Sequence, residues 1–212
     1  MKICLISATT ASLAPIEKAL KEVAPEVEYV HLLDSSLLKQ LKEKGQIDEQ
    51  ITLRFDTLIT LAVDAKCDGV LFTCSAFNDL ANYFDEKFTI PIVRSDQGLI
   101  NELLQYDNVG IVSTVKETPP VLISSLKKVR PDQIIKTVVE DGLIHLAEKG
   151  DFESHDKILQ GHIDSLAEEV EVIGLSQFSI AHLKGQVQIN KPIIDPAQTA
   201  VKEIIKRINE SA

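Results

Sequence analysis

Short apolar segments alternate along the chain with longer segments whose apolar residues recur at helical spacing. In residues 13–24, for example, Leu13, Ile16, Leu20 and Val23 fall on one helical face. The predicted strands are residues 2–7, 27–33, 69–73, 90–95, 109–114, 134–140, 170–176 and 191–196. The predicted helices are residues 13–24, 50–66, 197–209 and segments near 118–128 and 154–168. Strands that alternate with helices predict an α/β protein whose parallel sheets are flanked by helices.

The order of segments restarts near the middle of the chain, and three pairs of segments are similar between the halves. "ICLISATTASLAPI" aligns with "VGIVSTVKETPPVL", "CDGVLFTCSAF" with "VEVIGLSQFSI", and "IPIV" with "KPII". The three offsets agree within a few residues, which predicts a duplicated structure. We therefore expect two pseudo-symmetric lobes, one of residues 1–95 plus 196–212 and the other of residues 96–195.

Ligands of open parallel sheets bind beyond the carboxyl ends of the strands. In a duplicated structure those ends can face a shared ligand cleft between the lobes. The residues that follow the strands are then the candidates for lining it. They are Ser7, Thr9, Thr10, Cys74, Ser75, Ala76, Thr114, Thr118, Gln177 and Ser179.

Cys74 is the main candidate for a catalytic group, because it stands where a buried strand ends and a helix is predicted to begin. The free N–H groups and the positive dipole end of a helix N-terminus lower thiol pKa values. Cys74 could then act as nucleophile or base near neutral pH. The alternative is a small buried hydrophobic residue. Cys4 and Cys67 lie within or just before strands, and we interpret both as structural.

Hydroxyl residues are concentrated in two strand–helix connections, residues 7–12 and 113–118. Hydroxyls and backbone N–H groups in such places suit a carboxylate or a phosphate. The same residue types also cap helices and fill turns. Ser12 and Thr118 stand close to prolines and are predicted to be caps, whereas for Thr9, Thr10 and Thr114 both roles remain open.

Composition narrows the range of partners. The 212 residues are 44% hydrophobic and carry a net charge of −10, which argues against a nucleic-acid or anionic-membrane surface but not against a pocket for a small acid. The apolar run at the start is too short for a signal peptide, and no run approaches the ~20 apolar residues of a membrane span. Three cysteines without a metal-like cluster predict free thiols and a cytoplasmic protein.

No metal or nucleotide motif is present in the sequence. His155 and His162 are seven residues apart, which is not the spacing of a helical zinc site. We expect residues 153–157 to be a solvated helix start and His182 to lie at the surface. Neither glycine-rich phosphate loop occurs, so nothing supports ATP or NAD.

Three segments together resemble the aspartate/glutamate/hydantoin racemase superfamily: "TCSAF" (73–77), "GIVSTVKET" (110–118) and "VIGLSQFSIA" (172–181). The resemblance covers nearly the whole chain. It implies two lobes, no cofactor, a homodimer and two cysteines, one per lobe, that exchange a proton with the substrate's α-carbon. It also implies that hydroxyls and N–H groups, here those of Ser7, Thr114, Thr118, Ser75 and Ala76, hold the substrate carboxylate.

The resemblance places Cys74 at the first thiol and Gln177 at the second, or Ser176 if the alignment is shifted by one residue. Glutamine neither gains nor loses a proton near neutral pH, so a symmetric two-thiol racemisation is not expected. One hypothesis is a cofactor-independent isomerase or lyase that acts on a small carboxylate through Cys74, with Gln177 orienting the substrate. A second is a catalytically silent carboxylate-binding protein. A third is an unrelated periplasmic-binder-like or flavodoxin-like protein.

Overall fold

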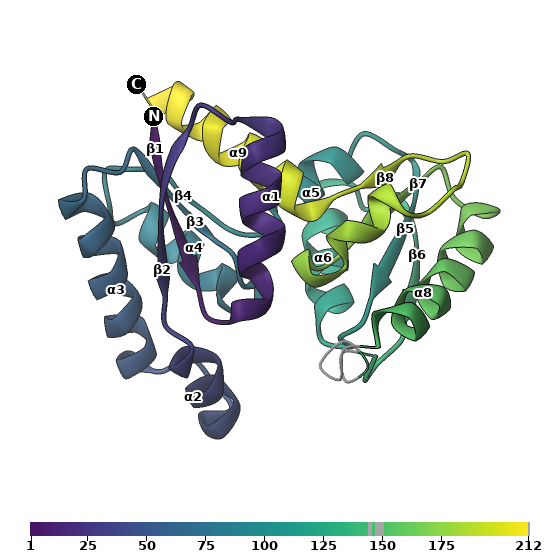
Figure 1. Cartoon of the computed structure of the whole chain (residues 1–212), viewed down its shortest axis with the longest axis horizontal. Coiled ribbons are helices and arrows are strands. Elements are labelled where there is room, and N and C mark those ends of the chain that lie inside the picture. Colours follow the sequence, from purple (N-terminus) through teal and green to yellow (C-terminus); the bar gives the residue numbers. More distant parts are fainter. Residues whose placement is uncertain (144–145, 147–150, 212) are drawn as a thin grey trace. The chain divides into compact units, whose positions relative to one another are not determined.

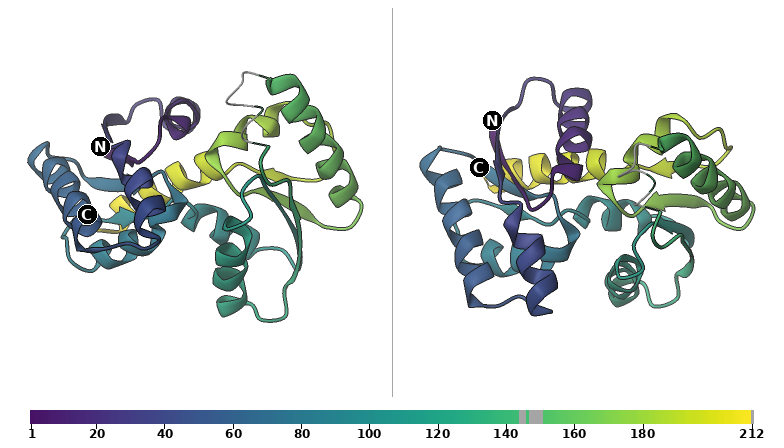
Figure 2. Two further views of the ribbon diagram at one scale, coloured as in Figure 1. Left: turned by 90° about the horizontal axis from the view of Figure 1, so that it is seen from below. Right: turned by 60° about the horizontal axis from the view of Figure 1, so that its bottom comes forward.

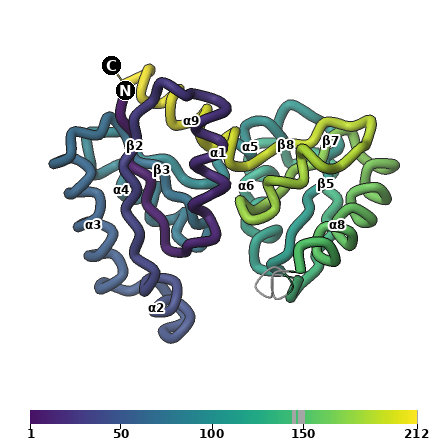
Figure 3. Tube along the Cα trace, in the orientation of Figure 1, coloured from purple at the N-terminus to yellow at the C-terminus, as the bar shows by residue number. Residues whose placement is uncertain are grey.

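The chain forms two compact units in a computed structural model that describes residues 1–143, 146 and 151–211. The first unit comprises Met1–Gln97 and Ala200–Ala212, and the second comprises Gly98–Thr199. The chain passes from the first unit into the second and returns through its last helix, as the trace shows (Figure 3). No helix within the described residues is long and apolar enough to span a membrane.

The first unit is a four-stranded parallel sheet with helices on both faces (Figures 1 and 2). Its strand order is β2-β1-β3-β4. The strands are β1 (Lys2–Ser7), β2 (Glu28–Leu33), β3 (Gly69–Phe72) and β4 (Ile92–Val93). The helices are α1 (Leu13–Val23), α2 (Ser36–Lys44), α3 (Glu49–Asp64), α4 (Asn78–Asp85) and the end of α9 (Pro196–Ser211). On one face Phe55 of α3 stacks on Phe72 of β3, with ring centroids 4.8 Å apart.

The second unit repeats this topology with strand order β6-β5-β7-β8. Its strands are β5 (Asn108–Ser113), β6 (Ile134–Val139), β7 (Val172–Leu175) and β8 (Ile193–Ile194), and its helices are α5 (Gln97–Leu103), α6 (Thr118–Val129) and α8 (Phe152–Ala167). Helix α8 packs on one face of the sheet, whereas α5 and α6 pack on the other. The predicted fold class, two lobes of parallel sheet flanked by helices, is confirmed.

Strand register decides which residue of the second unit corresponds to Cys74. Ile6 of β1 pairs with Phe72 of β3, and Val112 of β5 pairs with Leu175 of β7. Cys74 and Gln177 each stand two residues beyond these pairs. Each also precedes a 3₁₀ helix, η2 (Ser75–Phe77) or η3 (Phe178–Gly185), with extended backbone angles. Gln177, and not Ser176, therefore occupies the equivalent position.

Several elements differ from the sequence predictions. The strands predicted at 90–95 and 191–196 are only two residues long, and α2 and α5 were not predicted. Ser12 is the N-cap residue of α1, as predicted, but its side chain makes no cap hydrogen bond, because its hydroxyl is used elsewhere. The cap predicted at Thr118 is wrong, because Thr118 is the first residue of α6 and Glu117 is the N-cap residue.

We predict that Gly110→Ala destabilises the protein by about 1–3 kcal/mol, because an added methyl group overpacks the contact between β5 and α8. A Cβ at Gly110 would lie 2.6 Å from Cδ2 and 2.8 Å from Cγ of Leu166. Urea unfolding followed by circular dichroism measures the change.

Gly161→Ala is the matched control, because Gly161 lies in α8 and a Cβ there would meet nothing within 4 Å. This variant should gain about 0.5–1 kcal/mol from improved helix propensity. Equal unfolding free energies for the two variants would show that the close approach at Gly110 is not a packing constraint.

Candidate active site

The carboxyl ends of β1 and β3 lie side by side because these two strands are hydrogen-bonded neighbours in the first sheet. The last residue of β1 is Ser7, and the residue after β3 is Thr73, whose backbone N–H donates to the Ile6 carbonyl over 3.0 Å. The connection that carries Thr9 and Thr10 and the connection that carries Cys74 therefore leave the sheet at the same edge. This is the edge at which open parallel sheets bind ligands.

Three buried hydroxyls form a hydrogen-bonded cluster at this edge. Ser7 Oγ lies 2.5 Å from Thr73 Oγ1, and Ser12 Oγ lies 2.9 Å from the same Thr73 oxygen. Ser12 also donates to the Thr9 carbonyl over 3.1 Å. Because Ser7, Ser12 and Thr73 are all buried, these bonds replace hydration that the hydroxyls would otherwise lose. Ser7, predicted to hold a ligand, instead ties the two connections together from beneath the surface.

His31, to which the sequence assigned no role, completes the cluster. His31 of β2 places Nε2 2.7 Å from Ser7 Oγ, and its Nδ1 lies 3.5 Å from Oε1 of Glu17 on α1. Burial lowers the pKa of His31, and the Glu17 carboxylate opposes that shift. Only the parallel pairing of β2 with β1 reveals this contact, because no local sequence motif marks His31.

Cys74 is half-buried and directly follows Thr73 of this cluster. Burial raises the pKa of its thiol above the ordinary 9.0, and a hydrogen bond from the Ala76 backbone N–H opposes the shift. The lowered pKa predicted from the sequence is therefore wrong. The α-helix α4 begins only at Asn78, after a short 3₁₀ helix, so desolvation outweighs any helix-terminus effect.

The other two cysteines are buried among hydrophobic side chains. Burial raises the pKa of Cys4 to about 12, and it also raises that of Cys67. Both thiols stay protonated and lack access to solvent, as expected for cysteines that serve only in packing. By surface exposure Cys74 is consequently the least buried of the three cysteines.

A hollow of about 490 Å³ opens next to this edge, between the connection after β1 and helix α2. Its lining includes Thr9 and Thr10 from the connection and Lys39 and Lys42 from the helix. Lys39 lies 3.8 Å from Glu43, whereas Lys42 has no salt-bridge partner among the described residues. Hydroxyls and ammonium groups around a hollow of this size suit a small anionic ligand. Thr9 and Thr10 thus line a hollow, and the Thr9 hydroxyl also accepts a hydrogen bond from Ala11 N; their contact with a ligand stays a prediction.

In the second unit the side chain of Gln177 is held by its neighbours. Its Oε1 accepts hydrogen bonds from Thr114 N at 2.8 Å, Thr114 Oγ1 at 3.1 Å and Ser113 Oγ at 3.2 Å. Thr114 and Ser113 are buried, so the Thr114 hydroxyl serves Gln177 rather than standing free for a ligand. The Gln177 amide nitrogen has no hydrogen-bond partner among the described residues and is the group that remains to donate.

The remaining predicted residues follow strands of the first or the second sheet. Ser75 and Ala76 are exposed at the start of η2, and the Ala76 N–H already serves the Cys74 sulfur. Thr118 and Ser179 are half-buried and make no side-chain hydrogen bond with another described residue. The structure brings Ser7 close to the segment of Cys74, and Thr114 close to Gln177, each within its own unit.

The expectation for the histidines of the second unit is partly wrong. His155 is buried rather than part of a solvated helix start, and it shares a carboxylate partner, Asp156, with His182. His182 is half-buried and lies far away in the sequence. Inspection of local spacing could not detect this cluster, because it forms through tertiary contact between α8 and η3.

We predict that the unfolding free energy decreases as the pH falls below about 6.5, the ordinary pKa of imidazole. In the folded protein the pKa of His31 is lowered, so the unfolded chain binds a proton in this range before the folded one does. The difference is absent above this range, where His31 is neutral in both states. The His31→Gln variant, which keeps a nitrogen to bond Ser7, should show a weaker pH dependence in urea unfolding. Identical slopes in both proteins would contradict the buried, neutral state of His31.

Comparisons with known proteins agree with this architecture. The model of the Asp/Glu/Hydantoin racemase family matches residues 3–204. No protein of curated function matches the chain by sequence. Allantoin racemase from Klebsiella pneumoniae superposes with a TM-score of 0.76 at 18% identity, over 99% of this chain and 88% of that one.

Two further solved structures are similar. A glutamate racemase from Bacillus anthracis gives a TM-score of 0.73 at 12% identity, over 99% of this chain and 82% of its own. An aspartate racemase homologue from Pyrococcus horikoshii OT3 gives 0.72 at 15% identity, over 98% of this chain and 99% of its own. At these identities the structures establish the fold, whereas the family match extends over most of the sequence. The chain therefore belongs to the Asp/Glu/Hydantoin racemase family.

Proposed function

We propose that the protein is a cofactor-independent isomerase or lyase that acts on a small carboxylate, with Cys74 as its single acid/base or nucleophile. The observation that carries the proposal is the position of Cys74. It is the least buried cysteine of a racemase-family chain, and it follows the buried hydroxyl cluster at the carboxyl edge of the first sheet. Family membership supplies the chemical class, and this side chain supplies a group that can transfer a proton.

The raised pKa of Cys74 favours one direction of proton transfer. A thiol that stays protonated at neutral pH is ready to donate its proton to a carbanion or enolate. In a lyase, a bond to the α-carbon breaks, the electron pair remains on the substrate, and the Cys74 proton is delivered to carbon. The sulfur keeps the electron pair of the S–H bond, and the N–H of Ala76 stabilises the resulting thiolate.

The substrate class follows from the groups that line the hollow between the connection after β1 and helix α2. This hollow offers the hydroxyls of Thr9 and Thr10 and the ammonium group of Lys42, which suit a carboxylate, whereas Lys39 is paired with the Glu43 carboxylate in the same lining. This local positive charge lies in a chain whose net charge is −10, so attraction of an anion must come from the hollow itself. The named neighbours are racemases of allantoin and glutamate, both small molecules with carbonyl groups.

Gln177 argues against a racemisation that uses two thiols. It occupies the position that corresponds to Cys74 in the second unit, and an amide cannot take up or release a proton near neutral pH. A racemisation in which two thiols exchange roles therefore lacks its second partner. A reaction that needs one proton donor, such as decarboxylation or isomerisation through an enolate, does not.

A second candidate function is binding without turnover. The observation that favours it is the fixation of Gln177 by three hydrogen-bond donors of its own unit. A side chain held in this way is suited to present its amide N–H₂ to a ligand oxygen, and such a contact requires no chemistry. This function uses the same carboxylate ligand but assigns no role to the Cys74 proton.

The first test measures access to and ionisation of the thiols. We expect iodoacetamide to modify Cys74 faster than the buried Cys4 and Cys67, with a rate that is still rising above pH 9.0 because burial raises the pKa of Cys74. Peptide mapping by mass spectrometry gives the rate at each site. Equal and slow modification of all three cysteines would remove the basis for a reactive Cys74.

The second test measures turnover. A panel of small mono- and dicarboxylates is incubated in D₂O, and NMR detects incorporation of deuterium at carbon or loss of substrate. Cys74→Ser should lower the rate about 10²–10⁴-fold, the usual contribution of an acid/base group. Cys67→Ser, a change at a buried cysteine, is the control and should keep the wild-type rate.

Thermal-shift measurements on the same panel separate the two functions. A carboxylate that stabilises both wild type and Cys74→Ser, but that wild type never converts or deuterates, would establish the binding function and refute the enzymatic one. Conversion of a carboxylate that depends on Cys74 would establish the enzymatic function and refute binding without turnover.

A further inference from the structure

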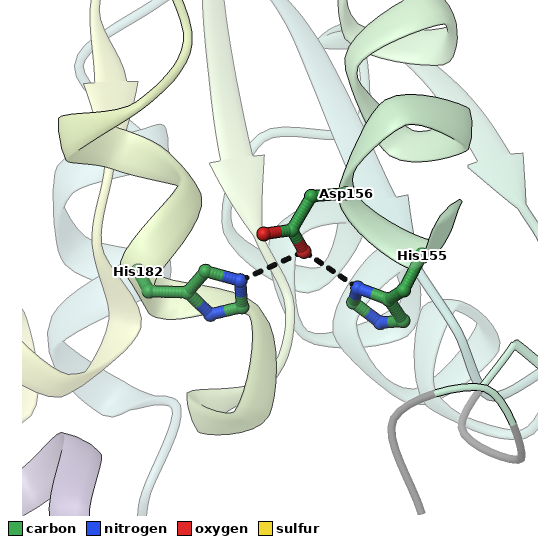
Figure 4. A group of neighbouring side chains, drawn as sticks. All are labelled: His155, Asp156 and His182. Atoms are coloured by element: carbon green, nitrogen blue, oxygen red, sulfur yellow. Dashed lines mark hydrogen bonds and ion pairs between the residues drawn. The ribbon is translucent and has the colours of Figure 1, made fainter. Parts of the chain in front are cut away.

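Two histidines and one aspartate of the second unit converge on a single oxygen atom (Figure 4). His155 and Asp156 lie near the start of α8, and His182 comes from η3. Asp156 Oδ1 lies 2.7 Å from His155 Nδ1 and 2.9 Å from His182 Nε2. The three side-chain atoms lie within 4.8 Å of one another, and the two imidazole rings are stacked with centroids 6.2 Å apart.

The cluster is protected on one side and open on the other. The side chain of His155 is only 4% exposed, whereas those of Asp156 and His182 are 21% and 30% exposed. A ring that is almost fully buried has its position fixed by packing, and the two more exposed side chains leave a route from solvent to the shared oxygen. This combination of a rigid ligand and an accessible face is what a site needs in order to load an ion.

We propose that His155, Asp156 and His182 form a binding site for a divalent transition-metal ion, with Zn²⁺ as the ion of choice. Two imidazole nitrogens and one carboxylate oxygen are the ligand set of open zinc sites, which keep a fourth position for water or another oxygen ligand. Imidazole ligands also select Zn²⁺ and its neighbours over Mg²⁺ and Ca²⁺, which prefer oxygen ligands.

The present geometry needs only a small adjustment to admit the ion. Ligand atoms around a tetrahedral zinc at about 2.0–2.1 Å are about 3.3 Å apart. The nitrogen–oxygen distances of 2.7 and 2.9 Å are a few tenths of an ångström shorter, as expected when a proton rather than an ion lies between the atoms. Because the shorter distance joins Asp156 to the buried His155, the adjustment falls on the more exposed side chains of Asp156 and His182.

Metal binding also requires that the two ring nitrogens facing Asp156 carry lone pairs rather than protons. A neutral imidazole carries one proton, which can reside on either nitrogen. When the proton of His155 is on Nε2 and that of His182 is on Nδ1, the nitrogens that face Asp156 become lone-pair donors. The ion then replaces the two hydrogen bonds to Asp156 with three bonds to itself, and the carboxylate supplies a negative charge next to it.

Isothermal titration of Zn²⁺ into tag-free protein that has been stripped with a chelator tests the proposal. We expect one ion per chain, and no comparable binding of Mg²⁺. Asp156→Asn, which keeps the shape of the side chain, and His182→Ala should each weaken the affinity at least about tenfold. Circular dichroism melts establish that the variants are folded, and the buried His155 is left unchanged for this reason.

His162→Ala is the matched control. His162 lies on the same helix and pairs with one carboxylate, Glu140, over 2.7 Å, but it has no second imidazole partner among the described residues. This variant should bind Zn²⁺ as wild type does. Cobalt substitution provides an independent readout, since Co²⁺ held by nitrogen ligands in a tetrahedral site absorbs strongly in the visible range, and the absorption should be lost in Asp156→Asn.

Absence of Zn²⁺ binding by the wild-type protein would overturn the proposal and leave a hydrogen-bonded trio. Binding that is unchanged in both Asp156→Asn and His182→Ala would overturn it as well, because the ion would then be held elsewhere. The result is independent of the function proposed for Cys74, since Cys74→Ser should still bind the ion.

Discussion

The hydrogen bond between Ser7 and Thr73 is the interaction on which the candidate site depends. It joins the carboxyl ends of β1 and β3 within the first unit, where both hydroxyls are buried and cannot be satisfied by water. Ser12 and His31 extend the bond into a cluster that fixes the peptide immediately before Cys74. A thiol on an otherwise loose connection would lack a defined position, and proton transfer to carbon requires one.

In the second unit, different side chains join the carboxyl ends of the two central strands, β5 and β7. Ser113 corresponds to Ser7, and Ser176 corresponds to Thr73, but the Ser176 hydroxyl is buried without a hydrogen-bond partner among the described residues. Gln177 supplies the missing connection, because its carbonyl oxygen accepts bonds from Ser113 and Thr114. Gln177, which stands where the first unit has Cys74, therefore also holds the edge of the second sheet together.

Much of this fold was predictable because it rests on buried parallel strands. The segments around β1, β3, β5 and β7 are continuous apolar runs, and their similarity between the halves indicated the duplication. What the sequence could not supply depends on contacts between distant segments. The raised pKa of Cys74 requires knowledge of its desolvation, and the pairing of His155 with His182 requires the packing of η3 against α8. The lengths of β4 and β8 depend on tertiary pairing in the same way.

A double-mutant cycle between Ser7→Ala and Thr73→Val, measured by urea unfolding, tests most directly whether this buried bond organises the edge. The account predicts that the two substitutions are coupled by about 0.5–3 kcal/mol, the range for side chains in direct contact. It also predicts that either single variant changes the rate at which iodoacetamide modifies Cys74. Additive unfolding free energies, together with an unchanged modification rate, would contradict the account.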